Sequence, residues 1–241
     1  MEANSILPLL IIGSSLIPGV LILMLREDQL KMRTFLNLLG AVAKVSLIAW
    51  VFAGHMSGEA YSFVFRLAPG LDFVLRVDQL GLFFATLSGV LWLITTLYAI
   101  GYLEGGKHRR RFFAFFSFCI TAATGIALSG NLITFFIYYE FLTLSTYPLV
   151  VHSGTDKAVN AGRTYLWYTI GGGTILFLGI VSLHVIAGPV SFGQTDIIAS
   201  LVSENTTQLT IIFFLMLAGL MVKAAVFPLH SWLPVSMVAP A

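Results

Sequence analysis

The sequence predicts an all-α integral membrane protein with about seven transmembrane helices, the seventh of them broken, and a small outer β-hairpin. Of its 241 residues, 58% are hydrophobic and only 10% are charged, whereas an average soluble domain carries about 25% charged residues. The mean hydropathy is +0.93. Seven apolar stretches also reach the length of about 20 residues that crosses a bilayer. These stretches are 5–25, 35–54, 79–103, 112–129, 131–151, 164–187 and 208–227.

The connections between these stretches predict the orientation. Nine of the 13 Lys and Arg residues lie in three alternate connections, 26–34, 104–111 and 152–163. Only Arg66 and Arg76 lie in the opposite connections, while Lys44 and Lys223 lie inside apolar stretches. Because Lys and Arg concentrate in cytoplasmic loops, we expect the N-terminus outside and the basic loops in the cytoplasm. The expected location is the inner membrane of a bacterial or archaeal cell.

Two outer connections are expected to be structured. In 55–78, two short alternating runs, 61–67 and 71–77, flank a Pro-Gly pair and predict a β-hairpin. In 188–207, the spacing predicts a short surface helix with an apolar face at Ile197, Ile198 and Leu201.

An acid and a base lie inside different apolar stretches. Glu140 is nine residues into its stretch, with Thr143 and Tyr147 at i+3 and i+7 on the same helix face. Burial favours the neutral form of a carboxyl group and a nearby cation favours the charged form. We therefore interpret Glu140 as a proton-loading carboxylate, with Thr143 and Tyr147 as accessory residues. The alternative is a glutamate that only holds helices together.

Lys223 is the predicted partner of Glu140. A lysine at bilayer depth costs roughly 2.5–3.5 kcal/mol on insertion scales. Pro228 and Pro234 follow it and predict a helix break. Broken membrane helices are tolerated where their backbone is buried or lines a wet cavity, as in transporter ion sites. His230, in the broken segment, is expected to be a proton relay or a cap. Snorkelling of Lys223 to the cytoplasmic surface is the alternative.

Two further residues are accessory candidates. Lys44 lies midway along its stretch without an obvious partner in the sequence, so snorkelling and contact with another subunit both stay open. His184 has the chemistry of a proton relay, although an interfacial side chain is the preferred interpretation.

Soluble-enzyme chemistry is not predicted. The sequence contains no GxSxG, Walker loop, dinucleotide fingerprint, CxxC or HExxH motif, so we expect no catalytic residue, metal or cofactor. The net charge of +2 argues against a nucleic-acid partner. A membrane enzyme using Asp72 and Asp78 is a further alternative, without a catalytic spacing to support it.

Three segments carry a family resemblance. YYEFLTLSTYPLV, LMVKAAVFPLHSWLPVSMVAP and VDQLGLFF resemble the antiporter-like, proton-translocating subunits of respiratory complex I and of Mrp-type multisubunit cation/proton antiporters. The K-x-x-x-F-P-x-H-x-W-L-P pattern is specific to them. Val235 stands where complex I members usually have an acid. The resemblance is therefore stronger to Mrp D-type or hydrogenase-linked members.

The resemblance implies a fold of about fourteen helices with two inverted five-helix repeats, each containing a broken helix. Glu140 matches the family's glutamate, Lys223 its lysine, and Pro228 and His230 its break. Residues 1–111 would then hold three transmembrane helices with the hairpin. Residues 112–241 would hold helices four to seven of an incomplete first repeat. The second repeat would lie in a longer chain or a separate polypeptide, so the chain alone is expected to be inactive.

The implied function is proton translocation through the Glu–Lys pair, within a redox-driven or cation/proton antiport complex. The complex would be NADH dehydrogenase-like, hydrogenase-like or Mrp-like. The implied partners are the lipid bilayer, other membrane subunits, H⁺ and, as an open question, Na⁺. A non-transporting scaffold subunit of such a complex is the alternative.

Overall fold

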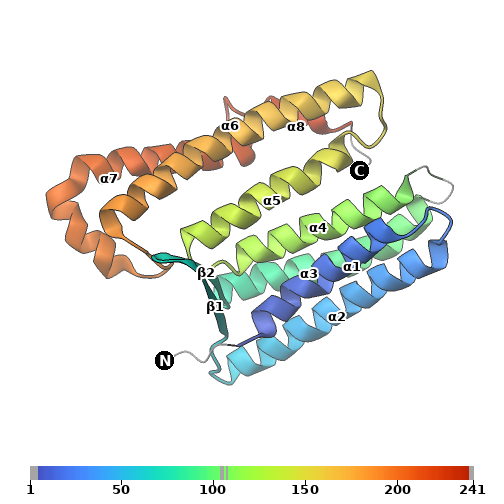
Figure 1. Ribbon diagram of the computed structural model, residues 1–241, viewed down its shortest axis with the longest axis horizontal. Coiled ribbons are helices and arrows are strands. Elements are labelled where there is room, and N and C mark those ends of the chain that lie inside the picture. Colours follow the sequence, from blue (N-terminus) through green and yellow to red (C-terminus); the bar gives the residue numbers. More distant parts are fainter. Residues whose placement is uncertain (1–4, 104–105, 107, 239–241) are drawn as a thin grey trace. The chain divides into compact units, whose positions relative to one another are not determined.

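The computed structural model describes residues 5–103, 106 and 108–238, without the side chains of 195–200, 203 and 204. Figure 1 shows a helical chain with one hairpin. The elements are α1 (Leu7–Met24), α2 (Leu30–Met56), β1 (Ser62–Ala68), β2 (Leu71–Arg76), α3 (Gln79–Tyr102), α4 (Arg109–Ala127), α5 (Leu132–Val150), α6 (Asp156–Ala187), α7 (Thr195–Lys223) and α8 (Trp232–Ser236).

Within the described residues, five helices are long and apolar enough to cross a membrane by length and composition. They are α1, α2, α3, α6 and the Asn205–Lys223 part of α7. The helices α4 and α5 have 19 residues each and are not among these five. The all-helical membrane architecture is therefore confirmed in its coarse form, and the number of seven crossings stays a prediction.

Two helices begin earlier than the sequence predicts. The helix α6 starts at Asp156 rather than 164, because the Thr155 hydroxyl accepts from the Ala158 amide (3.3 Å) and caps the new first turn. The surface helix expected within 188–207 is continuous with α7, with a kink at Asn205 (φ −127°, ψ 27°). The side chains of Ile197 and Ile198 lie outside the described residues, so the predicted apolar face stays a prediction.

By packing, the chain divides into two compact units. The first comprises Met1–Phe65 and Val74–Gly130, and the second comprises Arg66–Phe73 and Asn131–Ala241. The first unit thus contains α1 to α4, and the second contains α5 to α8. The predicted boundary between residues 111 and 112 marks the start of the repeat that the family resemblance implies. It is not a boundary between packing units, and it stays a prediction.

The first unit is a bundle of four helices. Its α1 and α3 each pack against both α2 and α4, so α2 and α4 face each other across the bundle interior. Ile22, Ala99, Phe113 and Ala114 form an apolar cluster within it.

The hairpin prediction is confirmed. β1 and β2 pair in a two-stranded sheet, within one residue of the predicted strands, and Gly70 supplies the left-handed turn conformation (φ +79°). The two aspartates considered for a membrane enzyme have structural contacts. Asp72 pairs with Arg66 (3.5 Å), and the Asp78 carboxylate caps α3 by accepting from the Gly81 amide (2.6 Å).

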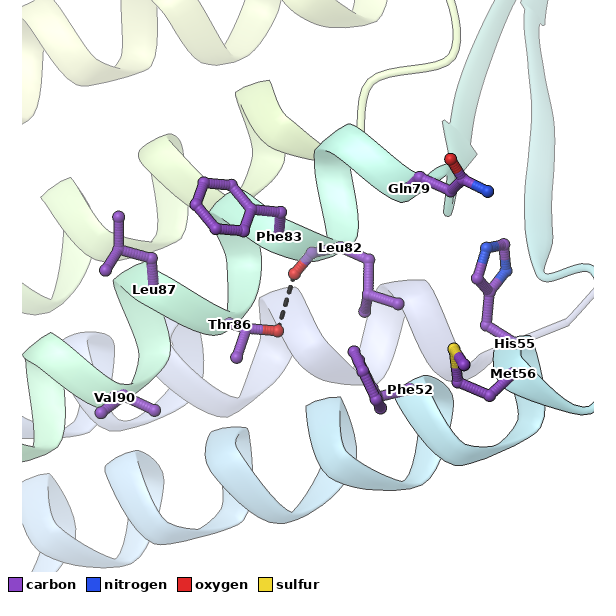
Figure 2. Close-up of a pocket in the computed structure, with 9 residues that line it drawn as sticks. All are labelled: Phe52, His55, Met56, Gln79, Leu82, Phe83, Thr86, Leu87 and Val90. Carbon is purple, nitrogen blue, oxygen red and sulfur yellow. Dashed lines mark hydrogen bonds between the residues drawn. The ribbon is translucent and has the colours of Figure 1, made fainter.

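A largely apolar groove of about 450 Å³ lies between α2 and α3 (Figure 2). His55 and Gln79 lie together at one end of it, and the Thr86 hydroxyl donates to the Leu82 carbonyl (2.7 Å). The groove belongs to the first unit, whereas the residues of the candidate site described below belong to the second. Its lining residues are Phe52, His55, Met56, Gln79, Leu82, Phe83, Thr86, Leu87 and Val90.

Candidate functional site

The predicted acid lies on α5, in the second unit. The Asn131 side chain accepts from the Thr134 amide (2.8 Å) and fixes where this helix begins. Glu140 is half-buried near the helix centre, and Thr143, one turn further, is fully buried. This face of α5 is thus turned toward other helices of its unit.

The carboxyl group of Glu140 is seated against the backbone of α6. Its Oε1 is buried and has no hydrogen-bond partner within the described residues. A Cβ atom at Gly173 of α6 would collide with this oxygen. Glycine at position 173 therefore provides the space that Oε1 occupies, and Oε1 stays available as an acceptor or as a proton-binding atom.

Lys223, the last residue of α7, reaches back onto α5. Its Nζ donates to the Tyr139 carbonyl (2.5 Å) and to the Thr143 hydroxyl (2.7 Å). It also lies 3.5 Å from the centroid of the Tyr139 ring. Two charge-assisted hydrogen bonds and a cation–π contact therefore hold the ammonium group.

The acid and the base are neighbours without direct contact. Lys223 interacts electrostatically with Glu140, yet the ion pairs found among the described residues do not include this one. The ammonium group instead contacts Tyr139, one residue before Glu140 on α5, and Thr143, three residues after it. The structure therefore brings Glu140, Lys223 and Thr143 into one site, with the two charges apart.

The helix α6 contains three consecutive glycines, Gly171–Gly173, and two of them allow close contacts with other helices. A Cβ atom at Gly172 would lie 2.7 Å from the Val222 Cβ on α7, whereas one at Gly171 would meet nothing within 4 Å. Gly172 therefore faces α7, and its neighbour Gly173 faces Glu140. The close approach of α6 and α7 brings Lys223 within reach of α5.

The end of α7 is not set by a proline. The helix ends at Lys223 rather than at the predicted residue 227, because Ala225 has a left-handed conformation (φ 52°). At this end the Val222 carbonyl accepts from the Ala225 amide (3.1 Å) and from the Trp232 indole (2.8 Å). Pro228 is exposed in the segment that follows, and Pro234 lies inside the short helix α8.

Other predicted residues lie away from the Lys223 ammonium contacts. His230 is exposed, and its ring lies 5.6 Å from the Phe227 ring. Tyr147 packs into an apolar cluster with Val150, Tyr165 and Trp232. His184 lies in the last turn of α6 and is half-buried.

Lys44 belongs to the first unit. Its side chain is 0% exposed, and its Nζ donates to the Thr124 hydroxyl on α4 (3.1 Å). The expectation that Lys44 snorkels or reaches another subunit is therefore wrong, because a partner on a neighbouring helix takes its ammonium group.

Sequence reasoning missed Tyr139 and Gly173. Tyr139 lies four residues before Thr143 on the same helix face, but its contributions are a backbone carbonyl and a ring face that no motif signals. The glycine triplet is recognisable as a packing feature, but which glycine faces Glu140 depends on the rotation of α6. No group of three His, Cys, Asp or Glu side chains able to hold a metal ion occurs in the described part of the chain.

Fold and site together define an integral membrane protein that places an acid and a base between helices of one bundle. Residues 129–241 match the family described as NADH:quinone oxidoreductase/Mrp antiporter, TM. The predicted resemblance is confirmed: the homologues of the chain are antiporter-like membrane subunits of Mrp antiporters and complex I, and the family match covers residues 129–241.

Named relatives support this assignment. The chain is 25% identical to the D-type subunit of the Na(+)/H(+) antiporter of Bacillus subtilis (strain 168), over 98% of this chain and 47% of the relative. It is 30% identical to the A/B-type subunit of a probable K(+)/H(+) antiporter of Rhizobium meliloti (strain 1021), over 83% and 20%. It is also 30% identical to the chloroplastic NAD(P)H-quinone oxidoreductase subunit 5 of Lotus japonicus, over 75% and 25%.

Two solved structures share the fold. The Mrp complex from Dietzia sp. DQ12-45-1b has a chain that is 26% identical, with a TM-score of 0.68 over 98% of this chain and 44% of that one. A chain of the membrane-bound sulfane sulfur reductase, an archaeal respiratory membrane complex, is 18% identical, with a TM-score of 0.83 over 100% and 48%. The present chain thus spans less than half the length of each of these relatives.

Proposed function

We propose that the chain forms part of a proton-translocating, antiporter-like membrane subunit of a redox-driven or cation/proton antiport complex. Glu140 and Lys223 are the groups that bind and pass on the proton. One observation carries this proposal: Lys223 lies on Tyr139 and Thr143, while the buried Glu140 Oε1 beside it has no partner among the described residues. The relatives named as antiporter and quinone oxidoreductase subunits support the same class.

In the proposed mechanism, Lys223 has two resting positions. When Glu140 is protonated, the ammonium group lies on the Tyr139 carbonyl and the Thr143 hydroxyl. When Glu140 loses its proton, the carboxylate attracts the ammonium group. Two unit charges 4 Å apart interact by about 4 kcal/mol at an effective dielectric constant of about 20. That energy is of the same size as the two hydrogen bonds that hold the ammonium group, at ~1.5–3 kcal/mol each, so gain or loss of the Glu140 proton shifts the balance between the two positions of Lys223.

The segment after Lys223 completes the proposed path. We take α7 and α8 as the two halves of a broken seventh helix, with Pro228 keeping the connection from becoming helical and Pro234 inside α8. The exposed His230 in that connection is placed to exchange protons with the surroundings. Tyr147 and His184 are accessory positions on α5 and α6.

The membrane arrangement in this proposal follows the sequence. The helices α4 and α5 cross the bilayer with the five longer ones, the N-terminus lies outside, and the basic loops lie in the cytoplasm of a bacterial or archaeal cell. The chain is the first half of a fourteen-helix subunit that works among other membrane subunits. The antiporter names of two relatives support a cation/proton exchange, with H⁺ and Na⁺ as the candidate ions.

Transport by the assembled complex in proteoliposomes tests the proposal. Glu140→Gln and Lys223→Met should each lower proton transport at least tenfold at normal assembly, because each removes one proton-binding group. Lys157→Met is the matched control, since Lys157 is an exposed lysine in the first turn of α6. Wild-type transport in both site variants would contradict the proposal.

A charge-swapped variant separates transport from a scaffold role. If the pair only holds α5 and α7 together, Glu140→Lys with Lys223→Glu should keep both assembly and transport. If the pair carries the proton, the swap should abolish transport in complexes that still assemble, because the acid would then occupy the end of α7. The Na⁺ question is answered by the same vesicles with and without a sodium gradient.

A further inference from the structure

The interior of the first unit is polar. Seven polar side chains there are at most 1% exposed, and each of the four helices contributes at least one. We call this set the polar ladder. It consists of Ser15, Asn37, Lys44, Thr96, Ser117, Thr121 and Thr124.

Lys44 lies at the centre of this interior. It is the fifteenth of the 27 residues of α2, which places it about 20 Å from either end of the helix at 1.5 Å per residue. Its Nζ donates to Thr124 (3.1 Å) and lies 5.8 Å from the centroid of the Trp92 ring. The stem of Lys44 lies against α3 at Gly89, where a Cβ atom would be 3.5 Å from the Lys44 Cγ.

The helices around Lys44 supply no counter-charge. Neither α1 nor α3 contains a charged residue, and α4 has only Arg109–Arg111 in its first turn. On α2 the other charged or titratable residues, Lys31, Arg33 and His55, are at least 11 positions away. The remaining titratable groups of α3 and α4 are Tyr98 and Tyr102, which are exposed, and the half-buried Cys119. Among the described residues no ion pair of Lys44 is found, and its electrostatic contact is the cation–π contact with the Trp92 ring.

The hydrogen bonds of Lys44 are also incomplete. An ammonium group has three donors, and among the described residues one acceptor, the Thr124 hydroxyl, is found for Lys44. The Thr124 hydroxyl directs its own proton to the Ile120 carbonyl (2.8 Å), so it serves Lys44 only as an acceptor. One neutral acceptor and one ring face therefore compensate the buried charge of Lys44 only in part, and a buried charge without a counter-charge is costly.

Polar contacts lead along the bundle from Lys44. The Ser117 hydroxyl donates to the Asn37 Oδ1 (3.3 Å). On both α2 and α4 this contact lies seven residues, or about two helical turns, before the Lys44–Thr124 contact. Between these two levels, the Thr121 hydroxyl lies 2.8 Å from that of Ser15. The ladder therefore spans about 10 Å of the interior at 1.5 Å per residue.

Several buried polar atoms of the ladder and of its neighbour Trp92 are suited to hydrogen-bond with buried water. Asn37 Nδ2, Thr96 Oγ1 and Trp92 Nε1 are buried without a hydrogen-bond partner in the described part of the chain. About one helical turn before Asn37 on α2, the Nε and Nη1 atoms of Arg33 are also buried without a hydrogen-bond partner among the described residues. Buried polar groups of this kind are usually satisfied by ordered water. Packing by small polar residues explains the Ser and Thr positions, but it does not explain Lys44 or Asn37 Nδ2.

We propose that Lys44 is a second proton-binding site, separate from the Glu140–Lys223 pair, and that water along the polar ladder connects it to the Arg33 end of the first unit. In one step, the Lys44 ammonium transfers a proton to a neighbouring water and becomes an amine. In the reverse step, the amine takes a proton from a hydronium ion. Only N–H and O–H bonds form and break, so no oxidant or co-reactant is required.

Nitrogen-15 NMR of lysine side chains in the assembled complex tests this site independently of transport. The chain has five lysines, Lys31, Lys44, Lys107, Lys157 and Lys223, and the Lys44 signal is the one lost in Lys44→Met. We expect this signal to convert reversibly between its ammonium and amine forms on titration. A Lys44 signal that stays ammonium at every pH at which the complex remains assembled would overturn the proposal.

Two neighbouring residues of α3 test the water path. Thr96→Val removes an unpartnered interior hydroxyl, whereas Thr95→Val removes an exposed hydroxyl that donates to its own helix at the Leu91 carbonyl. We expect hydrogen–deuterium exchange at the Lys44 Nζ to slow about tenfold in Thr96→Val only. Equal exchange in the two variants would refute the path.

A transport measurement separates a proton site from a structural ammonium group. Lys44→Arg keeps a positive charge and donors but cannot release a proton. If Lys44 exchanges protons during turnover, transport should fall in both Lys44→Arg and Lys44→Met at normal assembly. Wild-type transport in Lys44→Arg would show a structural charge and would contradict the proposal.

Discussion

Replacing Gly173 by alanine should displace the Glu140 carboxyl group while leaving the fold intact. A Cβ atom at position 173 collides with Glu140 Oε1, and this oxygen is the far end of a flexible side chain. A rotamer change costs about 0.5–1.5 kcal/mol. Replacing glycine by alanine inside a helix contributes about 0.5–1 kcal/mol in the opposite direction. The expected change in unfolding free energy is therefore within about 1 kcal/mol of zero.

Transport should respond far more strongly than stability. A misplacement of about 1 Å in a reacting group lowers a rate by about 100-fold, so Gly173→Ala should lower proton transport by roughly 10- to 100-fold. The assay combines thermal unfolding of the assembled complex with proton uptake in proteoliposomes. Gly171→Ala is the matched control, because a Cβ atom there meets nothing within 4 Å. Equal transport by the two variants would refute the role assigned to the Glu140 position.

Three further substitutions have expected outcomes. Gly172→Ala should destabilise the protein by about 1–3 kcal/mol by thermal unfolding, because its Cβ would lie 2.7 Å from the Val222 Cβ; an unchanged melting temperature would contradict the α6–α7 contact. Thr143→Val removes the acceptor of the Lys223 hydrogen bond and should cost about 1.5–3 kcal/mol, together with a loss of transport that a matched Thr146→Val variant does not show. Asp78→Ala removes the cap of α3 and should cost about 0.5–2 kcal/mol without changing transport per assembled complex; altered transport would instead support a chemical role for this aspartate.

Local signals made the helices and the hairpin predictable. A run of about 20 apolar residues specifies a spanning helix by itself, because lipid leaves the backbone few alternatives. The Pro-Gly pair between two alternating runs likewise specifies the hairpin. The start of α6 was missed because its first turn is polar, so the Thr155 cap rather than hydropathy defines it.

The detailed geometry of the site was not predictable in the same way. The composition marks Glu140 and Lys223 as costly residues that need partners, but the partners of Lys223 are the Tyr139 carbonyl and the Thr143 hydroxyl. Every residue carries a carbonyl, so no sequence pattern indicates which one accepts. The end of α7 was placed too late because proline is a visible helix breaker, whereas the left-handed Ala225 depends on tertiary contacts.

Infrared difference spectroscopy of the working complex provides a decisive test of the Glu140–Lys223 proposal. A protonated carboxyl band should appear and disappear during turnover, should be absent in Glu140→Gln, and should become static in Lys223→Met. That result would show that the proton on Glu140 and the position of Lys223 change together. A spectrum without a carboxyl band assignable to Glu140, or one unaffected by Lys223→Met, would contradict the coupling of these two residues.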